Sequence, residues 1–152
     1  MKARTGLPRT GGEIGLLLQV LAVLTMVRLL LPCVKLRTLL RWLEALPVRG
    51  RGDEGTLSEA SRYADALLWR IPGTRQRPCL VRSLTLYHFA RRWDLPVQLH
   101  CGARRVGGAL QGHAWLSLSG VPLMERGDPE ASYAVTFSHP VPASEPAKAE
   151  AA

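Results

Sequence analysis

The first half of the chain carries the hydrophobic spacing of α-helices. Apolar residues dominate positions 14–31 and 35–46, and a proline follows each run, where a helix cannot continue. We therefore predict a helix in each of these two ranges. The stretch at 46–55 that follows is rich in glycine and charge, which predicts a linker.

Two further helices are predicted after the linker. Thr56 and Glu59 have the spacing of a capping box, and the sequence Ile-Pro-Gly at 71–73 would end the helix that they begin. Apolar residues recur within it at helical intervals: Leu57, Ala60, Ala64, Leu67 and Leu68. The next helix covers 79–92, with an apolar stripe formed by Leu80, Leu84 and Tyr87, and His88 and most arginines fall elsewhere.

The hydrophobic period then changes from helical to alternating. Four ranges show the pattern of strands: 97–105, 113–118, 121–125 and 132–137. Ser119 and Gly120 predict a hairpin turn, and the glycine-rich stretch at 106–112 predicts a loop. Helices followed by an antiparallel sheet predict an α+β fold.

Length and composition indicate one domain with two terminal extensions. The chain has 152 residues, of which 47% are apolar, and this is enough for one core. We expect a flexible basic arm at 1–12, a helical region with its linker at 13–55, and the core at 56–138. The range 139–152 is rich in Pro, Ala and Glu, which predicts a disordered tail.

The charge balance favours acidic partners but not nucleic acid. The chain carries 20 Lys and Arg against 12 Asp and Glu, a net charge of +8. The arginines are spread along helices, and no basic stripe is interleaved with aromatic residues that would stack on bases. We therefore expect no nucleic-acid partner.

The apolar run near the N-terminus raises the question of a membrane. It extends from Ile14 to Val27, contains Gln19 and is closed by Arg28, whereas a spanning helix needs about 20 apolar residues. We favour a buried or partner-covered helix over membrane association. The three cysteines show no CxxC spacing, which fits a reducing cytoplasm better than a disulfide framework.

No metal or cofactor site is predicted. His100 and Cys101 are neighbours on a strand and point to opposite faces, and no HxxxH, HExxH or CxxC spacing occurs. The glycine stretch at 106–112 lacks the Lys-Ser/Thr of a phosphate loop. We therefore expect chemistry that depends on side chains alone.

Cys79 is the first candidate for such chemistry, because it begins the helix at 79–92. Unpaired backbone N–H groups and the helix dipole stabilise an anion at this position, and the neighbouring arginines act in the same direction. A nucleophilic thiolate is one interpretation. A small buried thiol without chemistry is the other.

His113 and a carboxylate could complete a catalytic triad. His113 opens a predicted strand and shares a face with Trp115 and Ser117, so its imidazole meets Cys79 only if that face packs on the cysteine helix. The predicted hairpin would bring Glu125 beside His113 to hold its Nδ1 proton, and Asp128 is the second candidate. Ordinary strand-edge residues are the alternative interpretation.

A set of motifs between residues 57 and 126 resembles a known family. These motifs are Cys79-Leu80, Arg82-Ser83-Leu84, Arg91-Arg92, Leu95-Pro96, Gly102-Ala103-Arg104 and His113-Ala114-Trp115. In this combination and order the chain is similar to the B2-type proteins of bacterial lasso peptide biosynthesis. These are stand-alone members of the transglutaminase-like, papain-related cysteine peptidase group.

The resemblance implies a fold, a reaction and partners. The fold would be a papain-like core with a cysteine-bearing helix packed on an antiparallel sheet. The reaction would remove the leader segment of a ribosomally made precursor peptide, with Cys79 as nucleophile and His113 as general base and acid. The family's acid is usually Asp, and here its place holds Glu125, so Asp128 stays an alternative.

The partners that the resemblance implies are the precursor peptide, a leader-recognition protein of the B1 type and an ATP-dependent macrolactam cyclase. Two other functions remain open beside leader removal. The same triad could transfer an acyl group to an amine, as true transglutaminases do. The chain could also be a non-catalytic binding subunit of the maturation complex.

Overall fold

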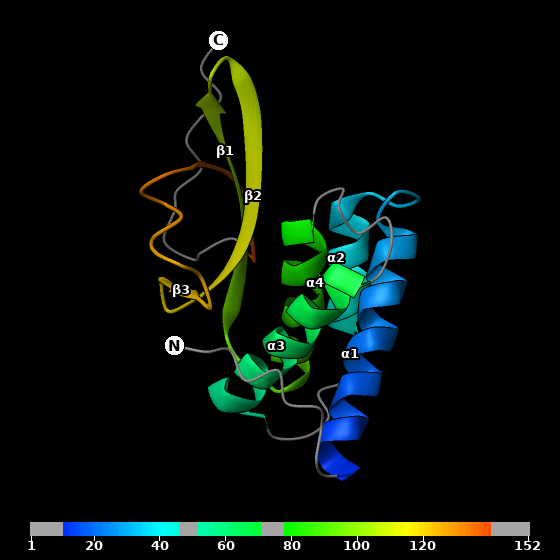
Figure 1. The fold of residues 1–152 in the computed structure, drawn as a ribbon. Coiled ribbons are helices and arrows are strands. Elements are labelled where there is room, and N and C mark those ends of the chain that lie inside the picture. The colour runs from blue at the N-terminus through cyan, green and yellow to red at the C-terminus, as the bar shows by residue number, and fades with distance from the viewer. Residues whose placement is uncertain (1–10, 46–51, 71–77, 141–152) are drawn as a thin grey trace.

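The computed structural model describes residues 11–45, 52–70 and 78–140. Four helices precede four strands (Figure 1). Their bounds are α1 Gly11–Leu30, α2 Leu36–Ala45, α3 Glu54–Arg70, α4 Pro78–Arg92, β1 Val97–Val106, β2 Ala109–Leu118, β3 Val121–Leu123 and β4 Ala134–His139. The helices lie on one side of the sheet, and this α+β arrangement confirms the predicted fold class (Figure 1).

Helix α4 lies at the centre of the fold. It contacts α1, α2 and α3 on one side and β1 and β2 on the other, and every residue from Ser83 to Ala90 is buried. His88 is therefore buried although it falls away from the predicted apolar stripe, because a helix covered by both layers has no exposed face at this point. Burial lowers the pKa of His88 to about 4, and the charge of Arg92 acts in the same direction.

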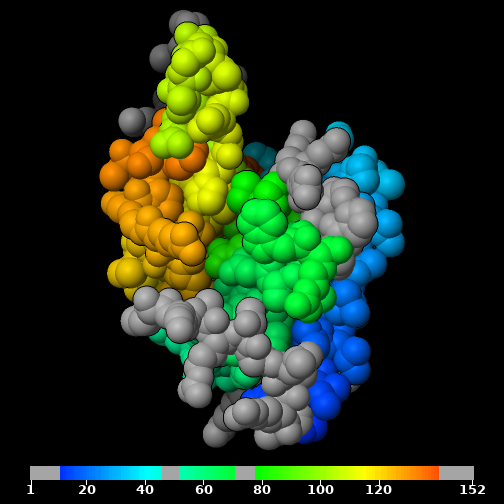
Figure 2. All heavy atoms as spheres, viewed as in Figure 1, coloured from blue at the N-terminus to red at the C-terminus, as the bar shows by residue number. Residues whose placement is uncertain are grey.

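The sheet has the order β3-β2-β1-β4, and all neighbouring strands are antiparallel. The loop predicted at 106–112 is wrong. Gly107 and Gly108 form a tight turn with positive φ angles of 55° and 83°, and β2 begins directly after them at Ala109. The resulting β1–β2 hairpin projects beyond the helical layer (Figure 2).

The capping prediction for α3 is also wrong in its detail. Asp53 is the N-cap, because its Oδ1 accepts hydrogen bonds of 2.8 Å from both the N–H and the hydroxyl of Thr56. Asp53 precedes Thr56 by three residues, so the helix begins at Glu54. Glu59 accepts a hydrogen bond from the Tyr63 hydroxyl instead.

Helix α1 is longer than its apolar run indicated. It covers 20 residues and, among the described helices, it alone is long and apolar enough to cross a membrane. By length this segment could therefore span a membrane, contrary to the prediction. Its buried residues are Val20, Leu24 and Val27, which join α4 in one core, and core helices and signal sequences share the same composition.

The predicted tail at 139–152 included His139, and this assignment is wrong. His139 belongs to β4, where it pairs with Leu99 in the register and lies 2.9 Å from Glu44 through Nε2. The rest of this tail, most of the linker and residues 1–10 of the predicted arm at 1–12 lie outside the described residues, whereas Gly11 and Gly12 of that arm belong to α1.

Candidate active site

Cys79 is the second residue of α4 and is partly exposed. Pro78 begins the helix, a position where its missing N–H costs nothing because the first N–H groups have no partner within a helix. For the same reason the backbone N–H of Cys79 has no partner within α4 and could donate to a ligand. Gln76, a possible side-chain donor, lies outside the described residues.

His113 and Glu125 are in contact. The imidazole Nε2 lies 3.1 Å from Oε2 of Glu125, and both side chains are partly buried. Strand β3 ends at Leu123, and Met124 then adopts a left-handed φ of 57°, which turns Glu125 toward the imidazole. Glu125 thus contacts Nε2 of the imidazole, so the predicted contact at Nδ1 is wrong. Nδ1 is then the nitrogen that remains for a thiol.

Arg82 ties this carboxylate to the helices. Its guanidinium donates to Glu125 at 3.3 Å, to Asp65 of α3 at 2.7 Å and to the hydroxyl of Ser61 at 2.8 Å. Cys79 and Arg82 are three residues apart and so lie on the same face of α4, one turn apart. Arg82 therefore brings Glu125 to the face of α4 that carries Cys79.

This role of Arg82 is a functional feature that sequence reasoning missed. The positive charge of Arg82 was expected to stabilise the thiolate, but its guanidinium is bound to Asp65 and Glu125. Two signals pointed to Arg82: its position one turn after Cys79 and its place in the Arg82-Ser83-Leu84 motif. The partner residue Asp65 carried no motif.

The face of β2 that carries His113 points away from α4. The opposite face packs on the helices, with Leu116 in the common core and the carbonyl of Ala114 accepting a hydrogen bond of 2.9 Å from Ser83. The condition that the His113 face packs on the cysteine helix is therefore not met. His113 instead lies against Trp115 and Tyr133, with ring centroids 5.8 and 5.2 Å away.

Cys79 and His113 nevertheless approach the same point of β1. Cys101 is on the face of the sheet that meets the helices, and the pKa of its thiol is raised to about 11 by burial and, next, by the charge of Cys79. The next residue, Gly102, pairs directly with His113. No hydrogen bond joins Cys79 to the imidazole within the described ranges, and such bonds often tighten only when substrate is bound.

The remaining candidates have other partners. Asp128 is exposed and caps the N–H of Glu130 at 2.9 Å, so Glu125 is the carboxylate beside His113. Both ring nitrogens of the buried His100 lie within 2.8 Å of serine hydroxyls. Three or more potential metal ligands do not cluster anywhere in the part of the chain that the structure describes.

The chain was compared with known protein families, curated proteins and solved structures. The sequence model of the transglutaminase-like superfamily matches residues 20–138, well over half of the chain. No curated protein and no solved structure matches it. The superfamily commonly contains cysteine proteases and acyltransferases, so the match supports thiol chemistry of this general kind. Because the match reaches from α1 through all but the last residue of β4, the chain belongs to the transglutaminase-like superfamily.

Proposed function

We propose that the chain is a cysteine peptidase that removes the leader segment from a ribosomally synthesised lasso precursor peptide. The observation that carries this proposal is the position of Glu125. Its carboxylate lies 3.1 Å from His113 and 3.3 Å from Arg82, and Arg82 belongs to the helix whose first turn holds Cys79. The superfamily supports the type of chemistry. The motifs shared with B2-type proteins support the substrate.

The proposed chemistry begins with Glu125, which fixes the imidazole proton on Nε2 and leaves the lone pair of Nδ1 for the thiol. His113 takes the proton of Cys79, and Sγ bonds to the scissile carbonyl carbon. The N–H of Cys79 stabilises the resulting oxyanion. The imidazolium then protonates the leaving amine as the C–N bond breaks, and His113 activates a water that hydrolyses the thioester.

The proposed partners follow from the product of this reaction. Cleavage frees an α-amine, which the ATP-dependent macrolactam cyclase would use to close the ring. A B1-type protein would present the leader to the peptidase. We place the reaction in the cytoplasm, where the three free cysteines stay reduced. Genes for a short precursor, a B1-type protein and such a cyclase are expected beside the gene of this chain.

The test compares cysteine variants of the full chain. The purified chain is mixed with the neighbouring precursor peptide and B1-type protein, and the products are weighed by mass spectrometry. Cys79→Ala should abolish cleavage. Cys33→Ala is the matched control, because Cys33 is exposed and lies outside the site, and it should cleave normally. Undiminished cleavage by Cys79→Ala would refute the proposal.

The masses also separate peptidase activity from acyl transfer, which the superfamily match equally supports. Hydrolysis adds one water across two fragments. Transfer to an amine conserves the total mass in a new linkage, and this product would replace the leader peptidase with a transglutaminase-type enzyme. A precursor left intact by the wild-type chain would favour a binding subunit.

A further inference from the structure

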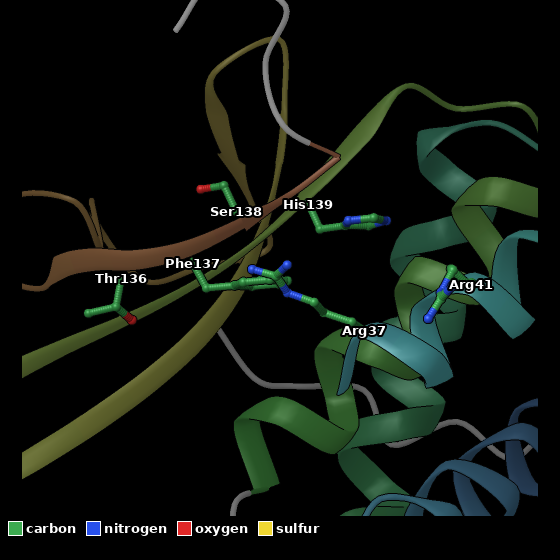
Figure 3. A pocket seen from close by; sticks show the side chains of 6 residues that line it. All are labelled: Arg37, Arg41, Thr136, Phe137, Ser138 and His139. Atoms are coloured by element: carbon green, nitrogen blue, oxygen red, sulfur yellow. The ribbon is translucent and has the colours of Figure 1, made fainter. Parts of the chain in front are cut away.

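A basic pocket lies between α2 and β4, apart from the residues around His113 (Figure 3). Its volume is about 510 Å³, within the range of ligand-binding pockets. Six residues line it: Arg37, Arg41, Thr136, Phe137, Ser138 and His139. Figure 3 shows Arg37 reaching from α2 across Phe137, with Arg41 one turn further along the helix.

The two arginines of this pocket are available to an anion. Both are exposed, and neither forms an ion pair within the described residues. Arg37 lies with its guanidinium carbon 6.0 Å from the ring centroid of Phe137. The nearby carboxylate of Glu44 already accepts hydrogen bonds from Tyr87 at 2.6 Å and contacts His139 at 2.9 Å. With two arginines against one nearby carboxylate, the pocket keeps a net positive charge, and guanidinium groups are suited to binding carboxylates.

The neighbouring strand favours an extended peptide as the carrier of those carboxylates. β4 is an edge strand of the sheet, and its residues from Ala134 to Thr136 are exposed. Such an edge offers unpaired backbone groups to an added strand, whose side chains then enter adjacent pockets.

The pocket lies on the same side of the sheet as the candidate cysteine. Phe137 pairs with Cys101 in the register of β1 and β4, so both side chains lie on the same face of the sheet. Cys101 is close enough to Cys79 to be affected by its charge. A peptide bound at the pocket beside β4 therefore lies on the side of the sheet that also holds Cys79.

We infer that this pocket binds an acidic segment of an extended peptide substrate, whose carboxylates pair with Arg37 and Arg41 while its backbone lies along the edge of β4. The inference rests on the proposed function for the identity of that peptide as substrate. Binding itself does not require cleavage, so the two can be tested separately.

The experiment measures binding with the full chain carrying Cys79→Ala. The probe is a fluorescein-labelled hexaglutamate peptide, its control is the labelled hexaglutamine peptide, and the readout is fluorescence anisotropy at two salt concentrations. Arg37→Gln with Arg41→Gln should weaken hexaglutamate binding about tenfold or more, because two charge-assisted contacts are lost. Arg62→Gln with Arg70→Gln, both exposed on α3, removes the same charge elsewhere and should change binding less than twofold.

Three results would overturn the inference: no hexaglutamate binding, equal binding of hexaglutamine, or equal weakening by the α2 and α3 pairs. Thermal unfolding followed by circular dichroism verifies that each variant is folded. If the wild-type chain cleaves its precursor but no hexaglutamate binds, the inference fails and the proposed function stands. If hexaglutamate binds at the arginines but no precursor is cleaved, the proposed function fails and the pocket stands.

Discussion

Replacing Arg82 by Met should destabilise the fold and the candidate site together. The guanidinium makes four contacts of 3.3 Å or less, with Asp65, Ser61, Glu125 and the carbonyl of Met124. Methionine keeps much of the length of the side chain but supplies no donor. The variant therefore isolates the loss of these contacts from the loss of packing.

The expected loss of stability follows from the exposure of each partner. Asp65 is half-exposed, so its ion pair contributes at most about 1 kcal/mol. Glu125 is only 14% exposed, and without Arg82 its carboxylate would keep the contact with His113 but lose the guanidinium. An under-satisfied carboxylate of this kind costs about 1–3 kcal/mol. We expect a total of about 3 kcal/mol, or a fall in Tm of about 6–12 °C for a domain of this size.

The expected loss of activity follows from the same contacts. Without Arg82, Glu125 no longer holds Nε2 of His113 in one orientation, and we expect kcat to fall at least about tenfold with little change in KM. Urea unfolding followed by circular dichroism measures stability, and precursor cleavage is measured where both proteins are folded. Arg62→Met is the control, because Arg62 is an exposed residue of α3.

The reasoning about Arg82 fails on either of two results. One is an unfolding free energy of Arg82→Met within about 0.5 kcal/mol of the wild-type value, because ordinary surface substitutions change the unfolding free energy by no more than this. The other is an unchanged kcat. Arg82→Lys separates charge from geometry, because lysine restores the charge without the forked donors, and it should recover stability only in part.

Three further predictions concern pH, reactivity and packing. The unfolding free energy should fall by about 3 kcal/mol from pH 6.5 to pH 4. Below pH 6.5 the unfolded chain protonates His88, whereas the folded chain does so only near its pKa of about 4. Urea unfolding at several pH values should show that His88→Phe lacks this dependence on pH. At pH 8 iodoacetamide should label Cys33 but leave Cys101, whose pKa is about 11, unmodified by mass spectrometry, and labelling at equal rates would contradict this. Gly102→Ala should lower the unfolding free energy by about 1–3 kcal/mol in thermal unfolding, because the added Cβ would lie 3.0 Å from a backbone carbonyl and from an indole ring. Gly112→Ala is the control and should be tolerated, because its Cβ would have one neighbouring atom, at 3.8 Å.

Local features of the fold could be predicted from the sequence because nearby residues determine them. The order of helices before strands followed from hydrophobic periods, and the turn at Ser119 and Gly120 followed from residues that tolerate the positive φ values of 52° and 80° found there. The same turn indicated that residues near 125 lie beside those near 113, because a hairpin determines which positions become neighbours, but the contact itself depends on where β3 ends.

Features that depend on packing between distant elements could not be predicted. The burial of His88 arises because α4 is covered by helices and sheet at once, and nothing in the local period of α4 carries that information. The contact of Arg82 with Asp65 joins residues 17 positions apart on two helices. Their sequence context identifies neither as a partner of the other.

The contact between His113 and Glu125 depends on the point at which β3 stops pairing with β2. The register pairs Leu116 with Leu123. Continued pairing through residue 125, as the sequence predicted, would set Glu125 opposite Ala114, on the face that meets the helices, while His113 lies on the other face. The left-handed backbone of Met124 breaks this alternation. Glu125 can therefore lie at the sheet edge, where it contacts both His113 on one side of the sheet and Arg82 on the other. The predicted strand ran two residues too far, and in that arrangement His113 and Glu125 would have been kept apart.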